Sequence, residues 1–238
     1  MKTIAFCALS IWARSLFVLL LLGLNACSLP RPAGTPVVYD FGPGNRQVAA
    51  THSVKAYPPL EVSAPRASSA LAGQAVLYRL VYADAQALKP YTLARWSMPP
   101  AQLIDQRLRE RLALRRAVVS TGELLRTTVA RRGASAPVTA QPEAIANLRL
   151  ELEEFSQLFE TPEQSAGLLR LRATLTRRSP GGDTLLAQRN FVAQQAATTL
   201  DAAGGVHALA TAADRVIVEV ERWLDQVLAA ERTQSFKE

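Results

Sequence analysis

Two segments in the second half of the chain alternate between apolar and polar residues. Apolar residues occupy every second position of 148–153 and again of 169–175, with arginine, glutamate or threonine between them. A period of two is that of a β-strand with one buried face. We predict an antiparallel pair joined by a link over 155–168. A turn at 179–183 and a third strand over 185–193 complete the predicted meander.

The charges of the first two strands are complementary. Glu151 and Glu153 are expected opposite Arg170 and Arg172 on the exposed face of the sheet. Exposed cross-strand pairs contribute about 0.2–1 kcal/mol each, which favours one register without holding the fold together. Their position on a solvent face also argues against a glycosidase-type carboxylate pair.

Shorter β-prone runs precede this meander. We expect strands over 37–41 and 57–62, the second at a sheet edge because its prolines cannot donate ladder hydrogen bonds. Strands over 76–82 and 88–96, joined by a loop over 83–87, form a predicted hairpin.

Two segments have helical periodicity instead. Pro99 and Pro100 suit the start of a helix, and Ile104, Leu108 and Leu112 then follow at intervals of four. Near the C-terminus, apolar residues recur at spacings of three and four: Val206, Leu209, Ala213, Val216, Val220, Trp223 and Val227. We expect this helix to pack across the sheet; coiled-coil association is the alternative.

These elements define the expected fold class. It is α+β, with a mainly antiparallel sheet and two principal helices packed on one of its faces.

The N-terminus has the layout of an export signal. Lys2 and Arg14 precede an uncharged stretch over 15–26, whose 12 residues are fewer than the ~20 that span a bilayer. The sequence Leu24-Asn25-Ala26-Cys27 resembles a bacterial lipobox. The resemblance implies that Cys27 becomes the acylated N-terminus, and Ser28 after it implies sorting to the outer membrane. A cleaved signal followed by an incidental cysteine is the alternative.

The expected organisation follows from this signal. Residues 1–26 are the signal peptide, 27–36 the acylated cysteine and a Pro-rich tether, 37–232 a single domain and 233–238 a polar tail. Loss of the signal removes Cys7, so no thiol remains for a disulfide. It also lowers the formal net charge from +7 to +5.

Most of this positive charge is arginine. A cluster lies between 107 and 132: Arg107, Arg109, Arg111, Arg115, Arg116, Arg126, Arg131 and Arg132. A solvated helix face is one interpretation, and contact with anionic lipid headgroups or an acidic protein is the other. Aromatic residues are not interleaved, so nucleic-acid binding is not expected.

Catalytic motifs are not found in the sequence. It contains neither a phosphate-binding Gly-x-x-x-x-Gly-Lys-Ser/Thr loop nor a Gly-x-Ser-x-Gly elbow. The two histidines, His52 and His207, lack a metal-ligand pattern around them. We therefore expect a protein that is not an enzyme, with no metal and no cofactor beyond the covalent lipid at Cys27.

The most informative run is 91–108, YTLARWSMPPAQLIDQRL. Its Tyr91, Arg95-Trp96 pair, Pro99-Pro100 and following leucines closely resemble the signature of the ABC-type transport auxiliary lipoprotein family. The segments 77–79 and 152–155 and the tryptophan of the last helix agree with that family, which includes the lipoprotein of the paraquat-inducible system.

The resemblance implies a fold similar to the N-terminal domain of TolB. It also implies a periplasmic, outer-membrane-anchored lipoprotein that works with an MCE-domain protein, an ABC permease and an ATPase to move lipids or other hydrophobic molecules. Some relatives form rings, which implies a possible homo-oligomer.

Two roles fit the motif residues Tyr91, Arg95, Trp96, Pro99 and Pro100. They fix the corner between a strand and a helix, or Arg95 and its surroundings bind the partner. At the level of the whole protein, an adaptor is the first hypothesis. A structural or assembly lipoprotein of another envelope complex, or a carrier with its own lipid pocket, is the alternative.

Overall fold

The computed structural model describes residues 34–44, 57–120, 145–179 and 182–235. The described residues from Pro36 onward belong to one compact unit. Several predictions lie outside the described residues: the signal peptide, Cys27, most of the tether, His52, Arg126, Arg131 and Arg132.

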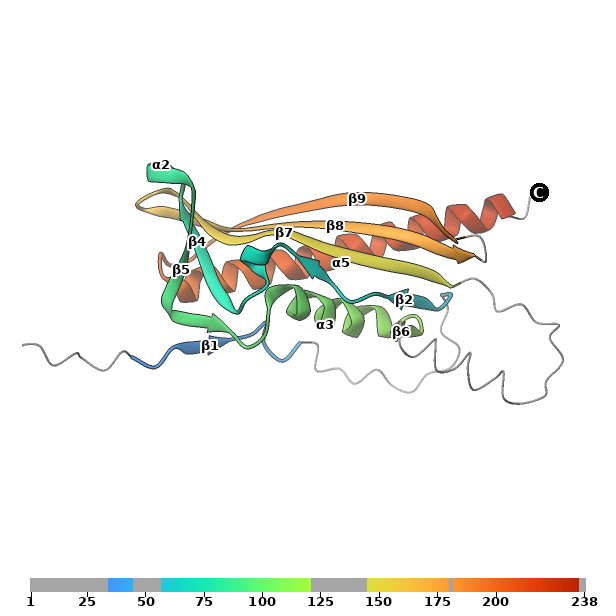
Figure 1. Ribbon diagram of the computed structural model, residues 1–238, viewed down its shortest axis with the longest axis horizontal. Coiled ribbons are helices and arrows are strands. Elements are labelled where there is room, and N and C mark those ends of the chain that lie inside the picture. The colour runs from blue at the N-terminus through green and yellow to red at the C-terminus, as the bar shows by residue number, and fades with distance from the viewer. Residues whose placement is uncertain (1–33, 45–56, 121–144, 180–181, 236–238) are drawn as a thin grey trace, which may run out of the picture. The chain divides into compact units, whose positions relative to one another are not determined.

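Three long strands form the largest part of the sheet (Figure 1). They are β7 (Ala146–Thr161), β8 (Gln164–Ser179) and β9 (Gly182–Ala196), and each pairs antiparallel with the next. The predicted meander is therefore confirmed. The predicted link over 155–168 is wrong, because β7 and β8 continue through it and meet at a turn of two residues.

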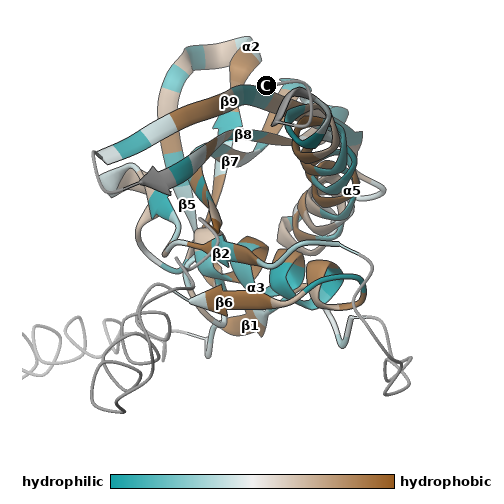
Figure 2. Cartoon of the chain, turned by 90° about the vertical axis from the view of Figure 1, so that its right-hand side faces the viewer, coloured by the Kyte–Doolittle hydropathy of each residue, from teal (hydrophilic) through white to brown (hydrophobic). Residues whose placement is uncertain are grey.

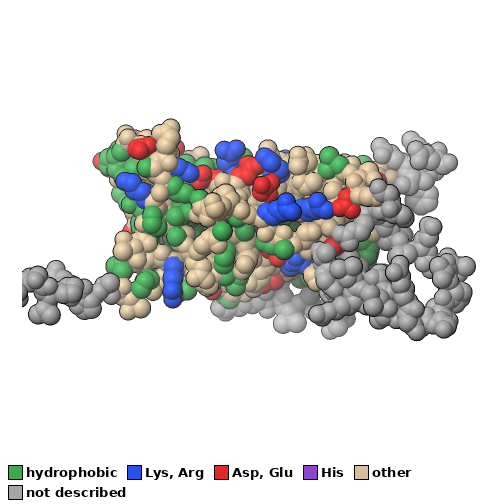
Figure 3. All heavy atoms as spheres, in the orientation of Figure 1, with side chains coloured by type: hydrophobic (Ala, Val, Ile, Leu, Met, Phe, Trp, Pro, Cys, Tyr) green, Lys and Arg blue, Asp and Glu red, His purple; other side chains and the backbone are tan. Residues whose placement is uncertain are grey.

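The apolar positions of these strands share the inner face. The alternate leucines of β7 and β8 are buried: Leu148, Leu150, Leu152, Leu169, Leu171 and Leu175. On the outer face Arg172 contacts Glu153 at 2.5 Å and Glu151 at 3.5 Å, and Arg170 lies 3.6 Å from Glu153. The predicted cross-strand ion pairs are present, and Figure 3 shows positive and negative side chains interleaved over these strands.

The remaining strands are shorter. They are β1 (Val37–Tyr39), β2 (Leu60–Val62), β3 (Arg66–Ala67), β4 (Ala75–Leu80), β5 (Ala85–Trp96) and β6 (Val118–Ser120). The order along the main path is β1-β5-β4-β7-β2-β6. Among the described strands five of the eight pairs are parallel, so the sheet is mixed. The three long strands are antiparallel, but the predicted mainly antiparallel sheet is not confirmed.

Two strand predictions need correction. The segment 57–62 contributes β2, which pairs with both β6 and β7 and is not an edge strand. Its prolines precede the paired residues, so they cost no ladder bond. The predicted hairpin is formed by β4 and β5, but Val81 and Tyr82 belong to a single helical turn, α2 (Val81–Asp84). A short 3-10 helix, η2 (Ser69–Leu71), precedes β4.

Two helices cover the inner side of the curled sheet (Figure 2). The first, α3 (Pro100–Ala113), contacts β6, β7 and α5, and the second, α5 (Ala202–Ser235), contacts all three long strands. Side chains of both helices and of the sheet form one buried core. The C-terminal helix thus packs across the sheet, as predicted, and not as a coiled coil.

Candidate functional site

The end of β5 turns into α3 at an aromatic corner. Trp96 is 1% exposed and lies among the rings of Phe41 and Phe155, with centroids 5.7 and 5.5 Å away. Its indole N–H has no hydrogen-bond partner among the described residues. The tryptophan therefore serves as a core anchor that joins β5, β7 and the segment after β1.

The two prolines start the helix. Pro99 is the N-cap and is extended, with φ −50° and ψ 137°, whereas Pro100 is the first helical residue and is buried. Neither position needs a backbone donor, because the first N–H groups of a helix have no intrahelical acceptor. For Trp96, Pro99 and Pro100 the structure thus agrees with the corner-fixing role.

Tyr91 joins a polar chain inside the sheet. Its hydroxyl donates to Oε1 of Gln157 at 2.8 Å, and Nε2 of Gln157 donates to Oγ of Ser165 at 2.8 Å. Gln157 is fully buried, and the ring of Tyr78 lies 4.6 Å from that of Tyr91. Burial, with smaller contributions from Tyr78 and Asp201, raises the pKa of Tyr91 to about 12.

We expect Tyr91→Phe to lower the free energy of unfolding by about 1–3 kcal/mol, because it leaves the buried oxygen of Gln157 without a donor.

In the unaltered protein, the free energy of unfolding should fall as the pH rises above 10. The unfolded tyrosine releases its proton there, whereas the folded one retains it until about 12. Denaturant titrations and tyrosinate absorbance measure both effects. The exposed Tyr82→Phe is the control; a late titration that survives in Tyr91→Phe would contradict the assignment.

Arg95 alone of the five motif residues is exposed. It follows the buried Ala94, so its side chain lies on the outer face of β5 together with that of Leu93. Among the described residues, its guanidinium forms no ion pair or hydrogen bond. Among the five motif residues it is therefore the most accessible to a partner.

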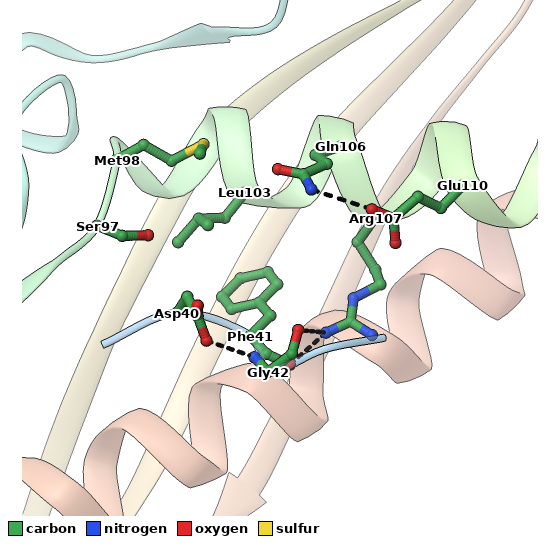
Figure 4. Close-up of a pocket in the computed structure, with 9 residues that line it drawn as sticks. All are labelled: Asp40, Phe41, Gly42, Ser97, Met98, Leu103, Gln106, Arg107 and Glu110. Carbon is green, nitrogen blue, oxygen red and sulfur yellow. Dashed lines mark hydrogen bonds between the residues drawn. The ribbon is translucent and has the colours of Figure 1, made fainter. Parts of the chain in front are cut away.

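A small pocket lies beside the corner (Figure 4). Its volume is ≈ 190 Å³, and it is lined by Asp40, Phe41, Gly42, Ser97, Met98, Leu103, Gln106, Arg107 and Glu110. Arg107 donates to the carbonyls of Phe41 and Gly42, and Asp40 accepts the N–H of Gly42 at 2.7 Å. These bonds hold the segment after β1 over α3. The volume is below the roughly 300–1,000 Å³ of pockets for drug-sized ligands.

The arginine cluster proves to be an interface within the protein. Arg111 contacts Glu221 at 2.6 Å, Arg115 contacts Asp225 at 2.9 Å, and Arg116 also pairs with Asp225. Further pairs join Arg109 to Asp105 and Arg107 to Asp214. Arg111 and Arg115 are exposed while they make these pairs, as expected of a solvated face, whereas Arg116 is buried. The sequence did not predict that these arginines pair with acidic residues of the same chain.

Burial makes one of these arginines unusual. Arg116 is 1% exposed, its pKa is lowered mainly by that burial, and the ring of Tyr57 lies 5.1 Å from its guanidinium carbon. Glu221 is also buried, although the sequence pattern places it on the polar face of α5.

The described residues contain no cluster of three or more histidine, cysteine or acidic residues that could hold a metal ion. His207 is exposed on α5 and belongs to no such cluster. Within the same residues, no helix is both long and apolar enough to cross a bilayer.

Fold and site together define an α+β protein in which the run 91–100 forms an aromatic corner with one exposed arginine. The family model of the ABC-type transport auxiliary lipoprotein component matches residues 39–221, and the chain belongs to that family.

Solved structures agree on the fold. Protein XCC0632 from Xanthomonas campestris, of the DUF330 family, is 16% identical with a TM-score of 0.57, covering 86% of this chain and 93% of its own. A structure described as an uncharacterized protein is 14% identical with a TM-score of 0.52, covering 80% and 99%. The search of curated proteins finds no match. The similarity to TolB is not tested by these structures and stays a prediction.

Proposed function

We propose that the protein is a non-catalytic periplasmic lipoprotein of an ABC transporter with an MCE-domain component, and that it acts as an adaptor anchored in the outer membrane through acylated Cys27. The transporter moves lipids or other hydrophobic molecules across the Gram-negative envelope. The match to the transport auxiliary family over 39–221 carries the proposal. The lipobox-like run 24–27 supports acylation of Cys27. Ser28, which follows it, supports sorting to the outer membrane.

An adaptor suits the interior better than a carrier does. The inner face of the sheet is filled by leucines and by both helices in one buried core. The pocket beside the corner, at ≈ 190 Å³, is small even for a drug-sized ligand. We therefore propose that the protein acts by binding partners at its surface. Arg95 contacts the MCE-domain protein, and the MCE-domain protein links the adaptor to the permease and ATPase.

Affinity purification of the tagged, acylated protein from solubilised envelopes tests the proposal. We expect an MCE-domain protein, a permease and an ATPase to be enriched. Recovery of a different envelope complex without these three would refute the transporter assignment and favour a structural or assembly lipoprotein instead.

We expect Arg95→Ala to reduce recovery of the MCE-domain protein by about tenfold, the effect of losing a charge-assisted hydrogen bond. Quantitative immunoblotting of the purified complex measures it. Arg222, exposed on α5, provides the matched control Arg222→Ala. Both variants should unfold at the same denaturant concentration as the unaltered protein. Undiminished recovery with Arg95→Ala would exclude Arg95 from the interface.

A further inference from the structure

β1 is an end strand of the described sheet and has one open edge. It pairs with β5 in parallel, with Val38 beside Arg95. The carbonyl of Tyr39 accepts the N–H of Ser97 at 2.7 Å, so the backbone groups of Tyr39 point toward β5. Successive residues of a strand direct these groups to opposite sides. The N–H and C=O of Val38 therefore point to the open edge.

Apolar side chains surround this edge without being covered. Val37, Val38 and Leu93 are 52%, 50% and 51% exposed. Val38 shares the outer face with Leu93 and Arg95, because it is the register partner of Arg95 and the inward positions of β5 are Ala94 and Trp96. An open backbone edge, two half-exposed apolar side chains and one arginine without an ion pair among the described residues thus lie side by side.

We propose that this edge receives an extended, acidic segment of a protein partner, which adds a strand beside Val38. Its apolar side chains pack on Val38 and Leu93, and a carboxylate pairs with the guanidinium of Arg95. The inference rests on the proposed function, because the segment belongs to the transporter component that the adaptor contacts.

The charges of the edge select this occupant. Arg95 offers one positive charge, which suits a carboxylate on a neighbouring strand. An anionic bilayer surface attracts polybasic clusters of about four to eight residues, and here Asp40 directly follows β1. Pro36 has no N–H to donate, so the ladder begins at Val38 and is short. The side-chain contacts consequently supply much of the specificity.

Methyl NMR on the full acylated chain in detergent tests the edge directly. The probe is a peptide of alternating valine and glutamate, compared with one in which lysine replaces glutamate. We expect the methyl signals of Val38 and Leu93 to shift with the acidic peptide alone. Arg95→Glu should weaken that binding at least about tenfold and favour the lysine peptide. Arg222→Glu should leave binding unchanged.

A second variant tests the strand addition itself. Val38→Pro removes the open N–H while keeping an apolar side chain and Arg95 itself, and we expect several-fold weaker binding. Equal shifts with both peptides, or none with the acidic one, would overturn the inference. So would a response to phosphatidylglycerol vesicles in the absence of any peptide response, which would assign the face to lipid. If the edge fails while the transporter components still co-purify, the proposed function stands; if they do not co-purify, that function fails by its own test.

Discussion

Asp225→Ala is expected to lower the free energy of unfolding by about 3–5 kcal/mol, the range found when one partner of a buried ion pair is removed. Asp225 accepts hydrogen bonds from Arg115 at 2.9 Å and from Arg116. The side chain of Arg116 is buried, and its Nε and Nη1 have no hydrogen-bond partner among the described residues. Without Asp225 the charged guanidinium of Arg116 stays buried but no longer contacts a carboxylate that offsets the free-energy cost of its burial.

The chain offers a matched control on the same helix. Asp214 is also paired with an arginine, Arg107, but at 3.8 Å and with 56% of its side chain exposed. Exposed pairs contribute about 0–1 kcal/mol, so Asp214→Ala should change stability by no more than that. Guanidinium denaturation of both variants measures the difference. Equal losses would show that burial of the arginine does not set the cost.

A double variant separates charge from packing. Arg116→Met combined with Asp225→Leu replaces the pair with apolar side chains of related size. We expect it to recover most of the stability lost in Asp225→Ala, because the unpaired charge is gone. A double variant as unstable as the single one would indicate that shape, not charge, dominates at this position.

This interface could have been predicted from spacing. Arg111 and Arg115 are four residues apart, as are Glu221 and Asp225, and such a spacing puts both members of a pair on one face of a helix. In the structure α3 ends at Ala113, and Arg115 lies in the turn that follows it. Both helices are expected on one face of the sheet, and their charged pairs are complementary. The two helices are therefore expected to contact each other. Viewed as one patch, the arginines were not compared with the acidic residues of the C-terminal helix, and the match was missed.

The sheet was predictable where alternation is regular. The pattern over 148–153 predicted β7 and its register with β8, but a register shift between Leu152 and Glu154 then changes which positions are buried. After the shift, the alternation that marks a strand is no longer evident in the sequence. The short parallel strands β2, β3 and β6 have two or three residues each, too few to define a period or a partner.

The candidate site was predictable in part. The run 91–108 predicted that Trp96, Pro99 and Pro100 form the corner. Arg95, the other residue given a role in the prediction, is exposed and accessible to a partner. Gln157, the hydrogen-bond partner of Tyr91, was missed because it lies in the segment predicted as a link. A buried amide has no periodic signal of its own, and its role depends on three strands and a helix that meet only in the folded protein.

Gly167→Ala is expected to destabilise the protein by about 1–3 kcal/mol, the usual cost of overpacking a filled core. Gly167 lies in β8 beneath α5, where an added Cβ would be 2.7 Å from the backbone nitrogen of Leu209 and 2.9 Å from the carbonyl carbon of Ala208. These are main-chain atoms of a helix, so the clash cannot be relieved by turning a side chain. The helix itself must move away from the sheet.

The movement should be detectable at Tyr91 as well as in stability. The start of α5 packs on the same residue that Tyr91 binds, because a Cβ at Gly205 would contact the side-chain amide of Gln157. A displaced helix therefore admits water to the Tyr91–Gln157 pair, and the pKa of Tyr91 should fall from about 12 toward its ordinary value of 10.0. Gly73→Ala, with no atom within 4 Å of the added Cβ, is the control that should change neither quantity appreciably. Loss of stability with an unchanged Tyr91 titration would mean that the strain is absorbed within β8, and that the helix does not couple the two sites.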